Sequence, residues 1–482
     1  MALLNTNIGP ERVQVFDVPV GVVQIPGAAT SVTAFLISSS FLGAPVNSPV
    51  TINSLEEFEA QFGDPDDVLY EAYYAIQGYY DNAGIGATAI IVNVGVSPTA
   101  NSFIGSAANG TGLRALDAVD ALGLVCIPGL PLSLAYLVHP ALIDYSETVR
   151  AEFGATLSTT FSLAAMPRQI TRANTRATFL AAQLLASGAI TGNVVSLQGS
   201  PVLANVTPGM VVYKASTFIG TITAVDDGAD TITLTSVTGL ADNDMITIEI
   251  PTAVVYKDNV INNPSRLMAW YFNNVSVTDR SDTPPSPTVV VDPVGHVAGV
   301  IGRIDANIAI GGPSHAPAGI KFAGLAGVIG LSLSLSERLD AAPLRLAFIN
   351  RLQEFPGSGR VIFGGYTAGG SAVTASEQLI QVMRTLQYIK ASLEPGLRAF
   401  IWENFSPQTQ SEVERAIGSF LRNNIHLFPA GLPESEQFRV LRVEPTQDEL
   451  DQGLLRVRVL VRPNTAVRFI EIALEFPLPT SN

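Results

Sequence analysis

The sequence predicts a multidomain α/β (α+β) protein that has extended terminal arms and a small all-β module inserted into its outer part. Two observations predict this class. Helix-like and strand-like stretches alternate through residues 111–192, which is typical of α/β folds. Residues 193–250 are instead rich in Thr, Val, Gly and Asp, and short strand-like runs alternate there with turns. At roughly 100–200 residues per domain, the 482 residues allow about two to four domains.

The patterning divides the chain into consecutive parts. The start is irregular and interrupted by prolines, which predicts an arm, and the most regular pattern lies in the C-terminal third. We expect the following parts: an N-terminal arm at 1–27, an outer α/β domain at 28–192, the inserted β-module at 193–250, the second part of the outer domain at 251–318, a C-terminal inner domain at 319–466, and a C-terminal strand or arm at 467–482.

Capping residues and apolar spacing predict the individual elements. Ser54 and Glu57 form a capping box at the start of one helix, and Ser406 followed by Pro407 marks the start of another over 407–424. That second helix should bury Val413, Ala416, Ile417, Phe420 and Leu421. Further helices are expected at 67–81, 144–153, 171–187 and 378–393. Strands are expected at 31–38, 89–94, 122–127, 210–213, 218–225, 231–237, 245–250, 268–272, 398–402, 438–443 and 455–462.

Extended segments lie near both ends of the chain, at residues 13–18 and 467–476. A long apolar strand presents an edge that promotes aggregation unless another strand covers it. Either these segments pair within their own subunit or a neighbouring subunit completes them by strand addition. Pro19, Pro26 and Pro463 flank them and would serve as hinges.

The charge balance argues against nucleic acid as a direct partner. The chain has 27 basic and 42 acidic residues and a formal net charge of −15, whereas phosphate contacts need a basic face. Residues 13–113 contain acidic residues but no Lys or Arg. Two interpretations of this stretch stay open, namely a solvated acidic face and a patch that docks an arginine-bearing face of a neighbour. The apolar stretch 121–143 contains three prolines, so we expect no membrane insertion.

Enzyme chemistry has little support in the sequence. No Gly-Lys pair exists for a P-loop, no Gly-x-Ser-x-Gly elbow occurs, and the pattern that starts at Gly84 precedes a strand instead of following one. The single cysteine, Cys126, lies in an apolar run, and the histidines are isolated from other ligand-type residues. We therefore expect no catalytic, cofactor-binding or metal-binding residues.

Several segments carry a family resemblance in their order along the chain. They include Pro49 to Gly63, with Ser54, Phe58 and Phe62 in fixed places, and the tripeptide Trp402-Glu403-Asn404. Together these segments resemble the contractile tail sheath family of bacteriophages and related contractile injection systems. The resemblance skips residues 95–290, lacks the family's Pro-Gly-Val-Tyr start, and has His315 in place of a Lys. The matching segments are 25–36, 49–63, 73–80, 89–94, 295–305, 315–319, 350–364 and 402–404.

The resemblance implies a tail-sheath-like core and a structural role without enzymatic activity or a cofactor. Sheath subunits form stacked six-fold rings around an inner tail tube, and contraction drives that tube through a target cell envelope. The implied partners are further copies of the chain, the inner tail tube protein, and the baseplate and tail terminator proteins. The implied location is the virion tail, assembled in the cytoplasm of a bacterial host.

The resemblance also assigns roles to residues. The terminal arms would add strands to adjacent subunits, and Arg415 and Arg422 on the 407–424 helix would face the tube because they are cations on an acidic chain. Two alternatives stay open: another polymeric viral or cell-surface protein, such as a capsid or S-layer subunit, and an α/β enzyme with a β-insert. The residues expected in the inter-subunit strands are Val13, Val15, Phe16, Val18, Phe469, Ile470, Ile472 and Leu474.

Overall fold

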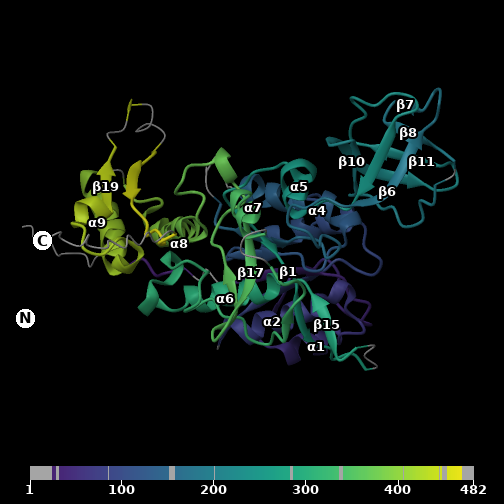
Figure 1. Ribbon diagram of the computed structural model, residues 1–482. Coiled ribbons are helices and arrows are strands. Elements are labelled where there is room, and N and C mark those ends of the chain that lie inside the picture. The colour runs from purple at the N-terminus through teal and green to yellow at the C-terminus, as the bar shows by residue number, and fades with distance from the viewer. Residues whose placement is uncertain are drawn as a thin grey trace, which may run out of the picture.

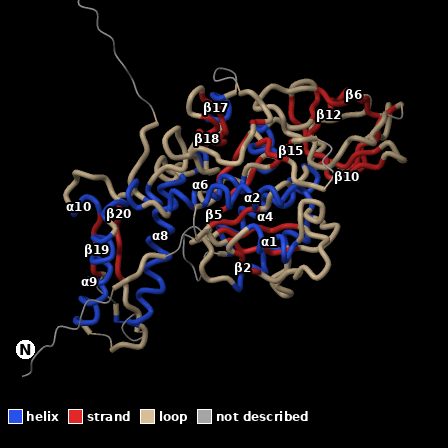
Figure 2. Tube along the Cα trace, turned by 90° about the horizontal axis from the view of Figure 1, so that it is seen from below, coloured by secondary structure: helices blue, strands red, loops and turns tan. Residues whose placement is uncertain are grey.

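The computed structural model consists of a central α/β body, a small β-module on one side and a C-terminal lobe on the opposite side (Figures 1 and 2). The inter-subunit strand residues named above, from 13–18 and from 469 onward, lie outside the described residues. The structure describes residues 24–28, 32–84, 86–150, 158–199, 201–282, 286–335, 340–404, 406–443, 446–447 and 453–468.

The central body is built on an eight-stranded sheet of order β18-β17-β13-β5-β4-β1-β3-β2. Its inner strands pair in parallel, and antiparallel strands lie at both edges. The middle strands are buried at every position, as expected for parallel strands that are covered on both faces. The strands are β1 (Thr33–Ile37), β2 (Val50–Ile52), β3 (Ala89–Asn93), β4 (Leu124–Cys126), β5 (Phe161–Ala165), β13 (Met268–Phe272), β17 (Ile349–Phe355) and β18 (Gly359–Phe363).

Helices cover both faces of this sheet and form two separate apolar cores. Successive residues of one strand enter different cores, as with Trp270 and Tyr271, because strand side chains alternate between faces. One core takes α3 (Ala100–Ile104) and α4 (Leu132–Asp144), and the other takes α1 (Leu55–Phe62), α2 (Ala72–Ala83) and α6 (Val294–Asp305).

Helices α2 and α6 approach each other closely because glycine lies at their contact. A Cβ atom added to Gly295 would lie 1.8 Å from the backbone oxygen of Ala75, which is far inside van der Waals contact. Gly295 lies in one of the segments that resemble the sheath family, and the contact explains physically why a residue with no side chain is needed there.

The β-module is a seven-stranded sheet of order β11-β10-β9-β12-β6-β8-β7, which closes on itself through an additional β11–β8 pairing. The expected strands at 210–250 are confirmed. The helix expected at 171–187 is wrong, because Thr178–Leu184 forms β6 and pairs with β12 along its length. The sheet therefore starts before residue 193. The strands are β6 (Thr178–Leu184), β7 (Ile190–Thr191), β8 (Val194–Gln198), β9 (Val211–Lys214), β10 (Thr217–Asp226), β11 (Thr231–Leu234) and β12 (Met245–Glu249).

Shorter elements complete the central body. Three strands form a small sheet of order β15-β14-β16 beside α2 and α6, and short helices connect the longer elements. None of the helices in the described ranges is both long and apolar enough to cross a bilayer. The remaining elements are β14 (Val275–Thr278), β15 (Thr288–Val291), β16 (Gly330–Leu331), α5 (Ala253–Val255), α7 (Ala341–Leu346) and α10 (Glu434–Gln437), the last of which belongs to the C-terminal lobe.

The C-terminal lobe has its own, smaller apolar cluster. It consists of part of α8 (Ile380–Leu397), α9 (Pro407–Asn423) and the two-stranded sheet of β19 (Phe438–Arg442) and β20 (Val457–Val461). The helix start at Ser406-Pro407 is confirmed, since the Ser406 hydroxyl accepts a hydrogen bond of 3.1 Å from the Thr409 amide. The apolar face expected for this helix is also buried as predicted.

Helix α8 belongs to both the central body and the lobe. Ile380 and Met383 near its start pack in the central core, whereas Ile389 packs in the lobe cluster. Arg384, with a side chain only 2% exposed, forms an ion pair with Asp305 of α6 and donates a hydrogen bond of 3.0 Å to the Gly123 carbonyl. These contacts fix the helix, and with it the lobe, on the central sheet.

We expect Asp305→Ala to lower the free energy of unfolding by about 3–5 kcal/mol, because it leaves the Arg384 guanidinium buried without its carboxylate partner. Chemical denaturation monitored by circular dichroism would measure this loss. The matched control is Glu434→Ala, which removes the partner of the half-exposed Arg422 and should cost at most about 1 kcal/mol. Equal losses in the two variants would contradict the importance of the buried pair.

Candidate functional site in the C-terminal lobe

The two-stranded sheet of the lobe has an incomplete architecture. Strands β19 and β20 pair antiparallel in a register that places Phe438 opposite Val461 and Arg442 opposite Val457. In the described part of the chain no third strand pairs with either of them. Isolated two-stranded sheets are only marginally stable in water, and an open edge presents unpaired backbone groups. The lobe therefore offers edges that a further strand can complete.

One face of this two-stranded sheet is covered by α9, whereas its two edges have no further strand partner in the described residues. Val440, Val457 and Val459 pack against the apolar cluster that α9 contributes to the lobe. Because the apolar face of the sheet already packs on α9, the side chains of a strand added at an edge could pack beside those of β19 or β20. The apolar alternation expected at 455–462 is what supplies this face.

The N-terminal segment of the described chain lies on the same lobe. Ile25 is buried in the lobe cluster, and Gly396 of α8 leaves room for it, since a Cβ there would lie 2.5 Å from the Ile25 Cγ2 atom. The Ala28 amide donates a hydrogen bond of 2.9 Å to the Ser392 hydroxyl, also on α8. Residues 1–27 are expected from their sequence to form an arm, but no local pattern indicates that the last of them dock on α8.

The C-terminal segment leaves the lobe close by. After β20, the Asn464 side-chain amide donates a hydrogen bond of 3.1 Å to the His426 carbonyl, and its backbone amide donates one of 3.1 Å to the Leu427 carbonyl. Val467 is then 81% exposed. Both ends of the described chain therefore depart from the lobe that carries the open sheet.

The two arginines proposed to face the tube lie on one side of α9. Arg415 and Arg422 are exposed and line a groove of 670 Å³ between α9 and β19, together with Arg439. Arg422 is paired with Glu434 at 3.3 Å, and Glu414 and Glu434 also line the groove. The groove is thus of mixed charge and not purely basic.

The short strand expected at 398–402 is wrong. Residues Arg398–Phe400 form a short helix that continues from α8, and the chain then turns outward. Ile401 and Trp402 are exposed instead of buried, and Trp402 is 99% exposed. An apolar run of four or five residues does not by itself distinguish a buried strand from an exposed turn.

Buried titratable groups elsewhere do not form a catalytic arrangement. The pKa of the fully buried His139 falls to about 3 and that of His296 to about 4, because burial disfavours the charged ring. His139 shares a hydrogen bond of 2.9 Å with the Tyr256 hydroxyl, and burial raises the pKa of Cys126. In the described ranges no group of three His, Cys, Asp or Glu side chains could hold a metal ion.

Asp292 is a buried carboxylate, and its contribution to stability changes with pH in the opposite direction to that of the buried histidines. Its pKa rises to about 6 because burial outweighs the hydrogen bonds that it accepts from the Val294 and Gly129 amides. The stabilisation that goes with its protonation is present at low pH and is lost as the pH rises through about 6.

We expect the free energy of unfolding to decrease from about pH 6.5 downward because of His139. The ring protonates near pH 6.5 in the unfolded chain but stays neutral in the native protein down to a pKa of about 3. Below pH 6.5 the unfolded state therefore binds a proton that the native state does not, a term of at most about 1.4 kcal/mol per pH unit.

Denaturation at pH 7 and pH 5 would measure this term, with His139→Gln as the comparison because glutamine keeps a polar group beside Tyr256 but does not titrate. The variant should lose less stability between the two pH values than the parent protein. The same loss in both proteins would contradict the assignment.

Comparisons with known proteins identify the fold. No protein-family model matches the sequence, and no curated protein matches it. Solved structures match over nearly the whole chain. The anti-feeding prophage helical sheath in its contracted state is 18% identical, with a TM-score of 0.59, and the match covers 97% of this chain and 99% of that one.

Two further structures agree with this match. The sheath complex of the extracellular contractile injection system PVC, also contracted, is 14% identical, with a TM-score of 0.61 and 98% of each chain covered. A chain of the anti-feeding prophage baseplate is 18% identical, with a TM-score of 0.59, and 98% of this chain and 100% of that chain are covered. The chain therefore has the fold of contractile sheath proteins, and the tail-sheath-like core predicted from the sequence is confirmed.

Proposed function

We propose that this chain is the structural subunit of a contractile sheath. In this proposal it polymerises around an inner tube and contracts to drive that tube through a target cell envelope. The observation that carries the proposal is the match to two contracted sheath structures over 97–98% of the chain. The role requires no catalytic residue, cofactor or metal, and the energy would be stored in the extended lattice.

The open two-stranded sheet supports a specific mode of polymerisation. Both described ends of the chain contact the C-terminal lobe, through Ile25 and Asn464, and the open β19–β20 sheet lies on that lobe. The segments proposed to add strands are residues 13–18 and 469–474. In our proposal these segments add strands to the corresponding sheets of neighbouring subunits. Backbone ladders of this kind would hold while the subunits move as rigid bodies, with Pro19 as a hinge. Pro26 and Pro463, also expected to be hinges, lie next to residues that are docked on the lobe.

The arrangement of the parts supports an orientation in the polymer. The lobe and the β-module lie at opposite sides of the central body in both views (Figures 1 and 2). The expected inner domain, 319–466, includes the lobe but also β17 and β18 of the central sheet. If the lobe is the innermost part of the subunit, the β-module lies on the outer surface. A module on the outer surface can vary without disturbing the contacts between subunits.

The proposed partners are further copies of this chain in stacked six-fold rings, the inner tail tube protein, and the baseplate and terminator proteins at the two ends. The likeness is to two structures of the anti-feeding prophage and to one of an extracellular contractile injection system. We extend the proposal to the virion tail, where the sequence resemblance placed the chain, with assembly in the cytoplasm of the bacterial host.

Removal of either arm tests the proposal. We expect the full chain to form tubes in electron micrographs, whereas a chain that ends at Ala466 or one that lacks residues 1–18 should stay soluble and folded but fail to polymerise. The physical reason is that each deletion removes the strands that would complete a neighbour's sheet. Circular dichroism supplies the control for folding, because every described strand and helix is retained.

Two results would contradict this account. Normal tubes from either truncated chain would refute the arm model. Failure of the full chain to form any tubular polymer, alone or with a tube protein, would refute the sheath function.

The proposed tube contact is tested by charge reversal. We expect Arg415→Glu/Arg422→Glu to weaken assembly of the subunit on its tube, and more strongly at low ionic strength, since the effect is electrostatic. The matched control is Arg172→Glu/Lys321→Glu, which makes the same change in net charge at exposed positions outside the lobe. Co-sedimentation with preformed tubes measures both. Equal binding by the two variants would overturn the assignment of this groove.

A further inference from the structure

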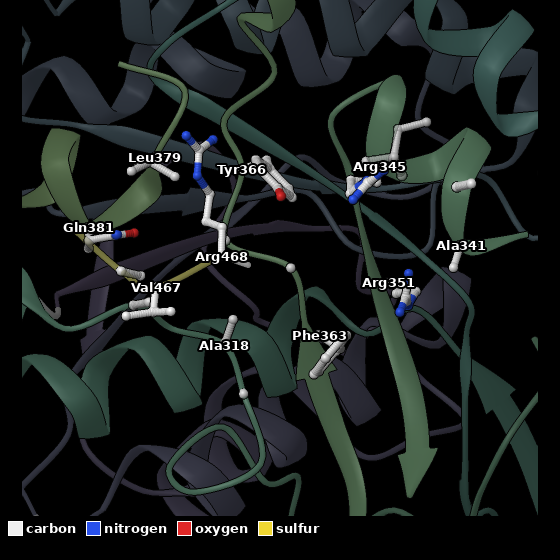
Figure 3. Close-up of a pocket in the computed structure, with 17 residues that line it drawn as sticks. Ala318, Ala341, Arg345, Arg351, Phe363, Tyr366, Leu379, Gln381, Val467 and Arg468 are labelled. Atoms are coloured by element: carbon white, nitrogen blue, oxygen red, sulfur yellow. The ribbon is translucent and has the colours of Figure 1, made fainter. Parts of the chain in front are cut away.

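A cavity of 500 Å³ lies at the edge of the central sheet, next to the lobe. It is bounded by α7, by the end of β18 and the residues after it, by the start of α8, and by residues 316–319 and 466–468 (Figure 3). Its volume falls within the range of roughly 300–1,000 Å³ that is typical of ligand pockets. Most of its wall is apolar, with contributions from Ala318, Ala341, Phe363 and Leu379.

One buried polar group in this wall has no hydrogen-bond partner. Gln381 is 1% exposed, yet neither its Oε1 nor its Nε2 atom has a partner in the described structure. Its amide points into the cavity in Figure 3. A buried amide without hydrogen bonds is unfavourable, so a group from outside the subunit that bonds to it would recover this loss.

The charged groups around the cavity are all cationic. Arg345, Arg351 and Arg468 line it, and no Asp or Glu occurs among the described residues of its wall. The cavity therefore favours an occupant that combines an apolar body, a hydrogen-bonding group for Gln381 and a negative charge.

The same chain displays a segment with these three properties. Trp402 is 99% exposed at the outward turn that follows α8, and its neighbour Glu403 is also exposed. The turn is held by hydrogen bonds from the Ile401 amide to the Arg398 carbonyl and from the Glu403 amide to the Phe400 carbonyl. Trp402 has a φ of +75°, a left-handed conformation that is costly for a bulky residue. A strained backbone that displays an aromatic side chain to solvent suggests a role in contact with a partner.

We propose that the Trp402-Glu403 turn of one subunit inserts into this cavity of a neighbouring copy. The indole ring would fill the apolar part, its N–H would donate to Gln381 Oε1, and the Glu403 carboxylate would pair with Arg468. The contact joins two different surfaces of the same chain and therefore propagates from copy to copy, as a ring or helical polymer requires. The inference rests on the proposed polymeric function and adds a contact that differs from strand addition, although Val467 and Arg468 at the start of the C-terminal arm form part of the cavity wall.

Cross-linking between two single-site variants tests the contact. One chain carries Asn404→Cys beside the turn, and a second chain of different length carries Ala342→Cys at the exposed rim of the cavity. The native Cys126 is fully buried and does not interfere. Mixed under polymerising conditions and oxidised, the two chains should form a covalent heterodimer. The matched control, Leu42→Cys on the second chain, is 96% exposed but remote from the cavity and should give none.

Side-chain changes then test the chemistry. Trp402→Ala in the Asn404→Cys chain should lower the cross-linking yield about 30-fold, the size expected for a hot-spot tryptophan. Glu403→Arg should also lower it, and Arg468→Glu in the partner chain should restore it.

Tubes that form without the Asn404–Ala342 cross-link, or a yield that Trp402→Ala leaves unchanged, would overturn the inference and leave the sheath proposal intact. Absence of any polymer from the unmodified chain would overturn both.

Discussion

The position of the C-terminal lobe on the central body depends on helix α8, which packs in the apolar core of both parts. Its first turns pack against the central sheet, and its last turns pack in the C-terminal lobe. Between them lies the Arg384–Asp305 ion pair, and Gln387 donates hydrogen bonds of 2.9 Å and 3.2 Å to the Thr160 and Ser158 carbonyls. A buried ion pair adds little net stability over an apolar pair, but it penalises any arrangement in which the charges separate. The orientation of the lobe on the body is therefore strongly specified.

The lobe that α8 positions is small and structurally incomplete. Its apolar cluster includes Ile25 from the start of the chain, and its sheet has two strands within the described residues. These features differ from those of the central sheet, whose middle strands are buried on both faces and whose edge strand β18 is covered by hydrogen bonds with residues 319–325. A closed body joined to a lobe with an open sheet is suited to the proposed lattice, because the body would keep its shape while the lobe takes up strands from its neighbours.

Local signals predicted much of this architecture. Helix α9 could be predicted because its two signals, the apolar spacing and the Ser406-Pro407 start, both come from residues that are close together in the sequence. The segment at 178–184 was wrongly predicted as a helix because Ala, Leu and Gln favour helices, whereas its pairing with β12 is a tertiary effect. The Arg384–Asp305 pair and the cavity around Gln381 could not be predicted, since their residues come from segments far apart in the sequence. The exposed Trp402 had only an apolar local pattern, which also fits a buried strand.

The most direct test of this account is a cryo-electron microscopy reconstruction of the polymer formed by the purified full chain. The account predicts a hollow tube of stacked rings in which the C-terminal lobes face the lumen and the β19–β20 sheet gains strands from neighbouring subunits. Lobes on the outer surface, or a sheet that stays two-stranded in the polymer, would contradict it.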